Sequence, residues 1–219
     1  MKLITELNTQ VEAFEEQLDE ATGKKALYIT GPFMESGVVN RNGRRYPKQI
    51  MEKEVNRYIR EKVDKNCAYG ELNHPKGPQM DLERACILIK ELNMNTKGQV
   101  IGKARVLSTP KGDIVKGLIE SGANLGVSSR GLGSLKDVGG IMEVQEDFKI
   151  VTASDVVADP SAPNAFVDGI MEGVDWIYNE TTGEWAEDTR TKYRSMSKSQ
   201  INEDAVRDFA RFMQLLKSN

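Results

Sequence analysis

The chain of 219 residues is 39% hydrophobic and 29% charged, and its 30 basic and 33 acidic side chains leave a formal net charge of −3. This size fits one domain with appendages or two small domains. Because the charges nearly balance, the composition shows no excess of basic residues for binding nucleic acid. No apolar run reaches the ~18 residues of a membrane-spanning helix. Residues 1–6 lack the apolar stretch of a secretory signal. We therefore expect no direct nucleic-acid partner and no membrane.

The first predicted element is a helix over residues 1–20. Apolar residues recur there at spacings of three and four on an acidic background, namely Leu3, Leu7, Val11, Phe14 and Leu18. Residues 21–25 then break the pattern with small and polar side chains. The helix therefore either packs on the core as an ordinary first element or serves as a detachable arm.

The central region, from Leu27 to about Gly169, is rich in short apolar runs. Two helices are predicted in it, one that Pro47 opens and that runs to about residue 65, and one that spans about residues 108–122. Strands are predicted over residues 27–30, 38–39, 67–72, 85–92, 100–107, 125–135, 141–144 and 148–157. Strands outnumber helices and do not alternate with them, which predicts an α+β fold with a mostly antiparallel sheet or barrel.

The last part of the chain is polar. Residues 173–200 show no core pattern, so we expect a linker or disordered tail there. An amphipathic helix is predicted after Asn202, with an apolar side formed by Val206, Phe209, Phe212, Met213 and Leu216. This helix either docks on the body or is a partner-binding, detachable tail. The chain is thus divided into an N-terminal arm (1–20), a central domain (21–172) and a C-terminal segment (173–219).

One histidine, His74, is present in the whole chain, in the run Gly-Glu-Leu-Asn-His-Pro at residues 70–75. Histidine is the side chain best suited to exchange protons near neutral pH, so an enzyme hypothesis has one candidate base. Pro75 favours extended geometry in Asn73 and His74, which would place the imidazole at the end of a strand. A lone histidine is, by itself, more often structural than catalytic.

Two adjacent serines, Ser128 and Ser129, lie between Gly126 and Gly131. A serine hydroxyl becomes a useful nucleophile when a base removes its proton and a third group orients that base. Flanking glycines let the backbone approach another segment closely and suit nearby N–H groups that could bind an oxyanion. By itself, this pattern is more often a simple turn.

Three other chemistries compete with a serine nucleophile. Glu71 and His74 have the Glu-x-x-His spacing of a di-iron helix, but that site needs the motif twice and the chain has no second histidine. A zinc site lacks ligands for the same reason. Cys67 and Cys86 lie in apolar runs, where a thiolate is disfavoured, so a cysteine hydrolase is the lesser alternative. No metal or organic cofactor is expected.

Four runs of the sequence carry a resemblance to a known family: Val-Val-Asn-Arg-Asn-Gly-Arg-Arg-Tyr-Pro (38–47), the histidine run (70–75), Gly-Val-Ser-Ser-Arg-Gly-Leu-Gly-Ser (126–134) and Asp-Val-Val-Ala-Asp-Pro-Ser-Ala-Pro (155–163). Together they resemble the prohead (procapsid) core proteases of T-even-type tailed phages, over about residues 27–168. The resemblance implies the fold of the herpesvirus assemblins, an antiparallel β-barrel core flanked by helices. The predicted terminal helices would add helical N- and C-terminal arms.

The resemblance also implies a function. It indicates a serine endopeptidase, made as a zymogen, that works inside the viral procapsid in the host cytoplasm. Its substrates would be the internal scaffold and core proteins and the N-terminal segments of shell proteins, including the major capsid protein. We expect a homo-oligomer, because the enzyme would be packaged as part of the core. The rival interpretation is a catalytically inactive scaffold or core protein that binds partners through its terminal helices.

Carried onto this sequence, the resemblance assigns the base to His74 and the nucleophile to Ser128. Ser129 is the runner-up, because adjacent residues of a strand point to opposite faces and only one of them can meet His74. Arg130 and the neighbouring backbone amides would support the oxyanion.

The third member of the triad is less well defined by the resemblance. Herpesvirus enzymes orient the base with a second histidine, which this chain lacks. We expect Asp155 to replace it, since it lies on a predicted strand after the nucleophile. Three other carboxylates remain as alternatives: Glu71, Asp81 and Asp159.

The family's substrate rule is cleavage after Glu, with Ile or Leu two residues earlier and a small residue following. Matches lie at the predicted segment boundaries: Glu20 before Ala21, Glu172 before Gly173 and, less well, Glu203 before Asp204. We therefore expect autocatalytic removal of both terminal arms. Recognition of a substrate Glu requires a cationic pocket, for which the candidates are Arg41, Arg44, Arg45 and Arg105.

Overall fold

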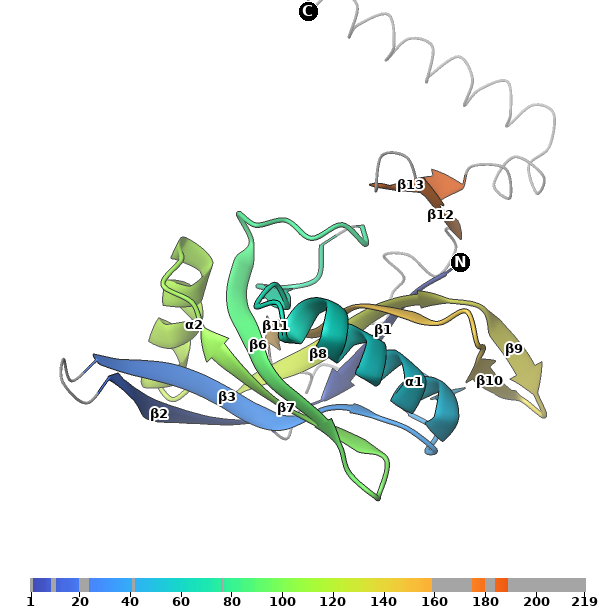
Figure 1. The fold of residues 1–219 in the computed structure, drawn as a ribbon, viewed down its shortest axis with the longest axis horizontal. Coiled ribbons are helices and arrows are strands. Elements are labelled where there is room, and N and C mark those ends of the chain that lie inside the picture. Colours follow the sequence, from blue (N-terminus) through green and yellow to red (C-terminus); the bar gives the residue numbers. More distant parts are fainter. Residues whose placement is uncertain are drawn as a thin grey trace, which may run out of the picture. The chain divides into compact units, whose positions relative to one another are not determined.

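The computed structural model describes residues 2–8, 11–19, 24–40, 42–75, 77–158, 175–179 and 184–188 (Figure 1). The chain divides into two compact units, Met1–Gly173 and Val174–Asn219. The described part of the second unit is an antiparallel hairpin of β12 (Asp175–Asn179) and β13 (Glu184–Asp188). No helix in the described residues is long and apolar enough to cross a membrane.

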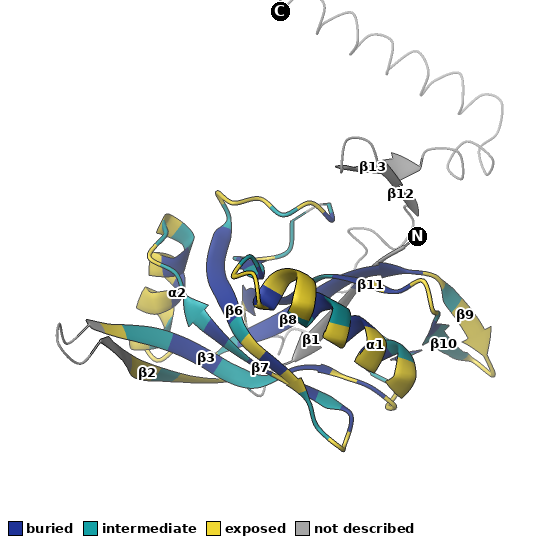
Figure 2. Cartoon of the chain, viewed as in Figure 1, coloured by how far each residue is buried: buried dark blue, intermediate teal, exposed yellow. Residues whose placement is uncertain are grey.

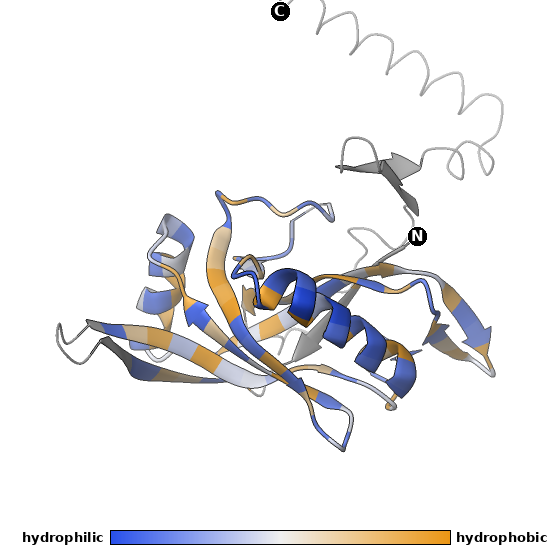
Figure 3. Ribbon diagram, viewed as in Figure 1, coloured by the Kyte–Doolittle hydropathy of each residue, from blue (hydrophilic) through white to orange (hydrophobic). Residues whose placement is uncertain are grey.

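One sheet of the first unit has five antiparallel strands in the order β2-β3-β7-β6-β5. In chain order these strands are β2 (Glu12–Asp19), β3 (Lys24–Glu35), β5 (Tyr69–Glu71), β6 (Ala85–Met94) and β7 (Gln99–Val106). Figure 3 shows the apolar stripe that β6 contributes to the core. The short strand β5 lies at the edge of this sheet and leads directly into the histidine run.

A second group of strands places β8 (Leu125–Gly133) between β1 (Lys2–Asn8) and β11 (Lys149–Ala158), with both pairings antiparallel. Residues 126–133 of β8 are all buried. A third sheet joins β4 (Arg44–Arg45), β10 (Ile141–Val144) and β9 (Leu135–Val138). The serine pair therefore lies on a strand that is covered along both edges.

Two helices complete the first unit. The helix α1 (Lys48–Tyr58) continues into the π-helical turn η1 (Ile59–Val63) and packs on β6 and β11 with Met51, Val55 and Tyr58 buried. Figure 2 shows the resulting division of α1 into a buried and an exposed face. The helix α2 (Pro110–Glu120) is capped by Thr109, whose hydroxyl accepts a hydrogen bond from the backbone N–H of Gly112 at 3.1 Å.

The two main sheets meet just after β5. Leu72 forms a parallel bridge with Val156, and the backbone N–H of Asn73 donates to the carbonyl oxygen of Val156 at 2.8 Å. The close approach requires Gly70, because a Cβ there would lie 1.9 Å from the carbonyl oxygen of Ser154. This junction brings the histidine run against β11 and β8.

Several predictions about the fold are confirmed and others are wrong. The mixed, strand-rich fold and both central helices are present, but the described strands form open sheets rather than a closed barrel. Residues 1–20 do not form a helical arm: residues 2–8 and 12–19 are β1 and β2. The linker expected over residues 173–200 contains the hairpin of β12 and β13, and the predicted helix after Asn202 lies outside the described residues.

Candidate active site

The backbone at His74 is shaped by an unusual residue. Asn73 has a φ of 60°, in the left-handed region that asparagine tolerates better than most side chains. The extended conformation expected at Asn73 is therefore wrong. The Nη2 group of Arg84 donates to the carbonyl oxygen of Leu72 at 2.8 Å and to that of Asn73 at 3.3 Å, so both peptide units of the turn are held.

The structure brings three of the expected side chains into one hydrogen-bonded chain. The Oγ of Ser128 lies 2.7 Å from Nε2 of His74, and Oδ2 of Asp155 lies 2.9 Å from Nδ1 of the same ring. An ionised carboxylate can only accept, so Nδ1 carries the proton and donates to it, while Nε2 accepts from the serine hydroxyl. Ser128 is 3% exposed and Asp155 is fully buried.

The register of β8 and β11 explains why these residues meet. Asp155 is the Cα partner of Ser128, whereas Ser129 is the partner of Glu6 on β1. Two register shifts in β11, between Ile150 and Asp155, place extra residues in that strand. Such bulges rotate the side chains that follow them, and here the result directs Asp155 toward His74.

Asp155 is held from several sides. Its Oδ1 accepts a hydrogen bond from the backbone N–H of Glu71 at 2.8 Å and from Nη2 of Arg130 at 3.3 Å. Its Oδ2 accepts from Nε of Arg130 at 2.5 Å as well as from His74. A carboxylate with this many partners is fixed in one orientation, which is what positioning an imidazole requires.

Arg130 does not point toward solvent. Its side chain is 0% exposed, and its guanidinium donates to Asp155 and to the carbonyl oxygen of Gly77 at 3.1 Å, while its Nη2 forms an ion pair with Oε1 of Glu71 at 3.2 Å. These donors are directed at buried carboxylates beneath the triad. The expected oxyanion role of this side chain therefore has no support in this geometry.

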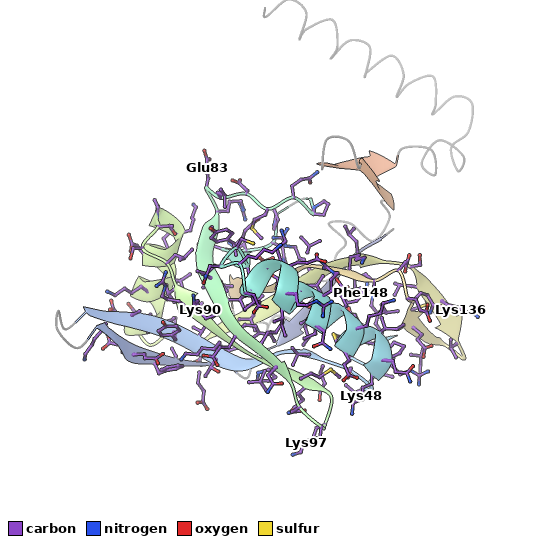
Figure 4. The ribbon with its side chains drawn as sticks, viewed as in Figure 1. Lys48, Glu83, Lys90, Lys97, Lys136 and Phe148 are labelled. Atoms are coloured by element: carbon purple, nitrogen blue, oxygen red, sulfur yellow. The ribbon has the colours of Figure 1, made fainter. Side chains whose placement is uncertain are left out.

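The other acidic candidates for orienting His74 do not contact its ring in the part of the chain that the structure describes. Glu71 is fully buried and pairs with Arg130 and Arg84 rather than with His74. Asp81 caps its own loop, since its Oδ1 accepts from the backbone N–H of Glu83 at 2.9 Å. Asp159 lies outside the described residues. Figure 4 labels Glu83 at the outer tip of this loop, which leads into β6.

The candidates for reading a substrate Glu are spread over different elements. Arg45, on β4, pairs with Glu143 at 2.6 Å, and Arg44 beside it is buried. Arg105 lies on β7, opposite Tyr28 and Leu88 in the five-stranded sheet. The remaining positions of interest lie outside the described residues: Arg41, Glu20, Ala21, Glu172, Gly173, Glu203 and Asp204.

A thiol nucleophile is disfavoured. Burial raises the pKa of Cys86 to about 12, and the negative charges of Asp155 and Glu71 raise it as well. Cys67 is only half-buried, and its thiol lies against the carbonyl oxygens of Glu61 and Lys62. Among the described residues, no group of His, Cys, Asp and Glu side chains could hold a metal ion.

Comparison with known proteins settles the family. The sequence model of the prohead core protein serine proteases matches residues 5–174. The chain belongs to that family.

A curated sequence and a solved structure, both from phage T4, support the assignment of this prohead core protease. The prohead core protein protease of Enterobacteria phage T4 is 48% identical over 148 residues, which are 66% of this chain and 69% of the relative. The solved structure of the bacteriophage T4 capsid assembly protease, gp21, matches with a TM-score of 0.65 at 38% identity, and the match covers 73% of this chain and 100% of that chain. The chain is therefore a peptidase of capsid assembly by family.

Proposed function

We propose that this chain is a serine endopeptidase with Ser128 as nucleophile, His74 as general base and acid, and Asp155 as the group that orients the imidazole. The observation that carries the proposal is the continuous path from the Asp155 carboxylate through both ring nitrogens to the Ser128 hydroxyl, with steps of 2.9 and 2.7 Å. An inactive scaffold would not need this path. The membership in a protease family supports the same conclusion.

The mechanism follows from the direction of the hydrogen bonds. His74 takes the proton of Ser128 as Oγ attacks the scissile carbonyl, and Asp155 stabilises the imidazolium that forms. The proton then passes from Nε2 to the leaving amine, which breaks the peptide bond and leaves an acyl-serine. Water activated by the same ring releases the second product. With Arg130 turned inward, backbone N–H groups near the serine are left to bind the oxyanion.

The proposed substrates are proteins of the procapsid interior and shell. The enzyme digests scaffold and core proteins and trims the major capsid protein, cutting after Glu when Ile or Leu lies two residues earlier. Two observations support the choice of procapsid proteins as substrates: the family description names the prohead core, and the T4 relative is called a capsid assembly protease. We propose that the enzyme acts as a homo-oligomer inside the procapsid.

The first test compares Ser128→Ala with Ser129→Ala. A fluorophosphonate probe modifies an activated serine hydroxyl, and scaffold digestion reports turnover. We expect Ser128→Ala to abolish both signals, a loss of at least about a thousandfold, because the Ser128 hydroxyl is the group that contacts Nε2 of His74, at 2.7 Å. Ser129→Ala is the matched control and should keep activity within about fivefold. Equal activity in the wild type and both variants would remove the serine mechanism.

A further inference from the structure

Asp155 of the proposed triad belongs to a cluster of four charged side chains, and the mechanism does not use the other three directly. We call it the charge cluster: Glu71, Arg84, Arg130 and Asp155. Glu71, Arg130 and Asp155 are at most 1% exposed, while the side chain of Arg84 is 34% exposed. The carboxylates and guanidiniums alternate, since Arg130 bridges Asp155 and Glu71, and Glu71 in turn reaches Arg84 at 3.2 Å.

We propose that Glu71 is a positioning residue for the proposed triad, which it serves through Arg130 and through the loop that carries His74. The inference rests on the proposed function, since it concerns the same three residues. Glu71 does not touch the reacting atoms. Its effect is to offset the positive charge of Arg130, so that negative potential remains at the imidazole, and to hold Asp155 in its orientation toward the ring.

The first argument is charge balance. Arg130 places Nε on Oδ2 of Asp155, the same oxygen that accepts from His74, so its positive charge opposes the effect of Asp155 on the ring. Glu71 lies on the other side of this guanidinium, with 3.2 Å between Oε1 and Nη2. Two buried carboxylates then share one arginine, and Asp155 keeps negative potential for the imidazolium. Arg84 balances the second carboxylate.

The second argument is the anchoring of the histidine loop. The Oε1 of Glu71 also accepts from the backbone N–H of Asp81 at 2.8 Å, and its backbone N–H donates to Asp155. Arg84, which Glu71 holds, donates to the carbonyl oxygens of Leu72 and Asn73. One buried carboxylate thus ties together β5, both ends of the loop after it and the orienting aspartate. A satisfied buried network of this kind fixes a single geometry.

A matched control exists elsewhere in the chain. Glu54 on α1 is also buried, at 4% exposure, pairs with Arg57 at 2.5 Å and accepts from a backbone N–H, that of Ile150, at 2.7 Å. It differs from Glu71 because Arg57 does not bridge it to Asp155. Glu54→Gln therefore reproduces the loss of a buried carboxylate–arginine pair away from the triad.

The experiment measures the rate of fluorophosphonate labelling and the thermal midpoint of the full-length chain. We expect Glu71→Gln to slow labelling roughly tenfold, a part of what general-base catalysis supplies, and Glu54→Gln to stay within about twofold of the wild type. In an Asp155→Asn background, Glu71→Gln should slow labelling by about threefold or less, because the part of its effect that passes through Asp155 is already lost and only the anchoring of the loop remains. A purely structural role would not produce that loss of additivity.

Three outcomes would overturn the inference. They are a labelling rate for Glu71→Gln within about twofold of the wild type, an equal loss in Glu54→Gln, or a full additional loss in the Asp155→Asn background. If Glu71→Gln does not fold, Arg84→Gln decides: a labelling rate reduced about threefold or more supports the inference, and an unchanged rate rejects it. Ser128→Ala distinguishes a failure of this inference from a failure of the proposed function, because labelling of that variant would refute the serine mechanism itself.

Discussion

At the scale of single residues, the site depends on which atoms each side chain can reach. Ser128 and Ser129 have the same chemistry and differ by one position, yet only Ser128 is paired with Asp155 across the two strands. Arg130 illustrates the same point, because its guanidinium is turned into the protein and bonds to buried carboxylates. The role of each of these neighbouring residues therefore depends more on the direction of its side chain than on its residue type.

The two cysteines provide a prediction about pH. Since the pKa of Cys86 is raised to about 12, its neutral thiol dominates up to well above pH 9, and the thiolate that reacts with iodoacetamide is scarce. We expect alkylation of the native protein between pH 7 and pH 9 to modify the half-buried Cys67 and to leave Cys86 intact. Mass spectrometry of peptides from the treated protein checks this, with denatured protein as the control in which both react.

The same treatment also tests the alternative nucleophile. Protein alkylated at Cys67 should keep its fluorophosphonate labelling, because Ser128 and not a thiol contacts His74. Loss of labelling in step with alkylation would instead favour a cysteine hydrolase. A Cys67→Ala variant separates a chemical role of this thiol from a steric effect of the added group.

At the scale of elements, small backbone features place the catalytic groups. Gly131 on β8 has no Cβ, and a Cβ there would lie 2.4 Å from the ring of Phe148, which Figure 4 labels beside α1. The bulges of β11 and the turn at Asn73 act similarly, since each changes the direction of the chain at a defined position. Gly131, next to the serine pair, therefore permits close packing, as its residue type predicted.

The turn at Asn73 allows a test with a matched control. A β-branched side chain is strongly disfavoured at a φ of 60°, so we expect Asn73→Val to lower the free energy of unfolding by about 1–2 kcal/mol and to slow labelling of Ser128. Asn73→Gly should preserve both. Chemical denaturation and the labelling rate are the measurements.

Asn66 is the control for that test. It has a φ of 54° in the turn that follows η1, and it accepts a hydrogen bond from Lys90. Asn66→Val should lower stability by a similar amount, about 1–2 kcal/mol, without changing the labelling rate of the folded protein. If both valine variants slow labelling equally, the turn at Asn73 has no special part in placing His74.

At the scale of the whole molecule, the N-terminal segment is part of the first unit. β1 pairs with β8 along residues 2–8, and Ile4 is 2% exposed within the core. The spacing of leucines over residues 1–20 predicted a helix, but pairing with a distant strand determined the outcome. Local periodicity is a weak signal when an adjacent strand supplies a full set of backbone partners.

This position of β1 sharpens the prediction of autoprocessing. Cleavage after Glu20, Glu172 or Glu203 should give new termini at Ala21, Gly173 or Asp204, which mass spectrometry of protein incubated with assembled cores can detect. Because β1 pairs with the strand of Ser128, loss of residues 1–20 should also expose the edge of β8 and lower the thermal midpoint. Ser128→Ala is the control that stays intact; complete scaffold digestion beside uncut chains would contradict the prediction.

The sequence by itself determined the strand-rich class, both central helices and the chemical groups from which a serine protease site can be built. It did so because those features depend on residue type, local periodicity and short motifs. Only the tertiary structure decided that β1 and β2 replace a helix, that Asp155 rather than Glu71 meets His74, and that Arg130 turns inward. These outcomes depend on strand register and on contacts between distant residues, such as the 84 positions that separate Glu71 from Asp155, which no local pattern encodes.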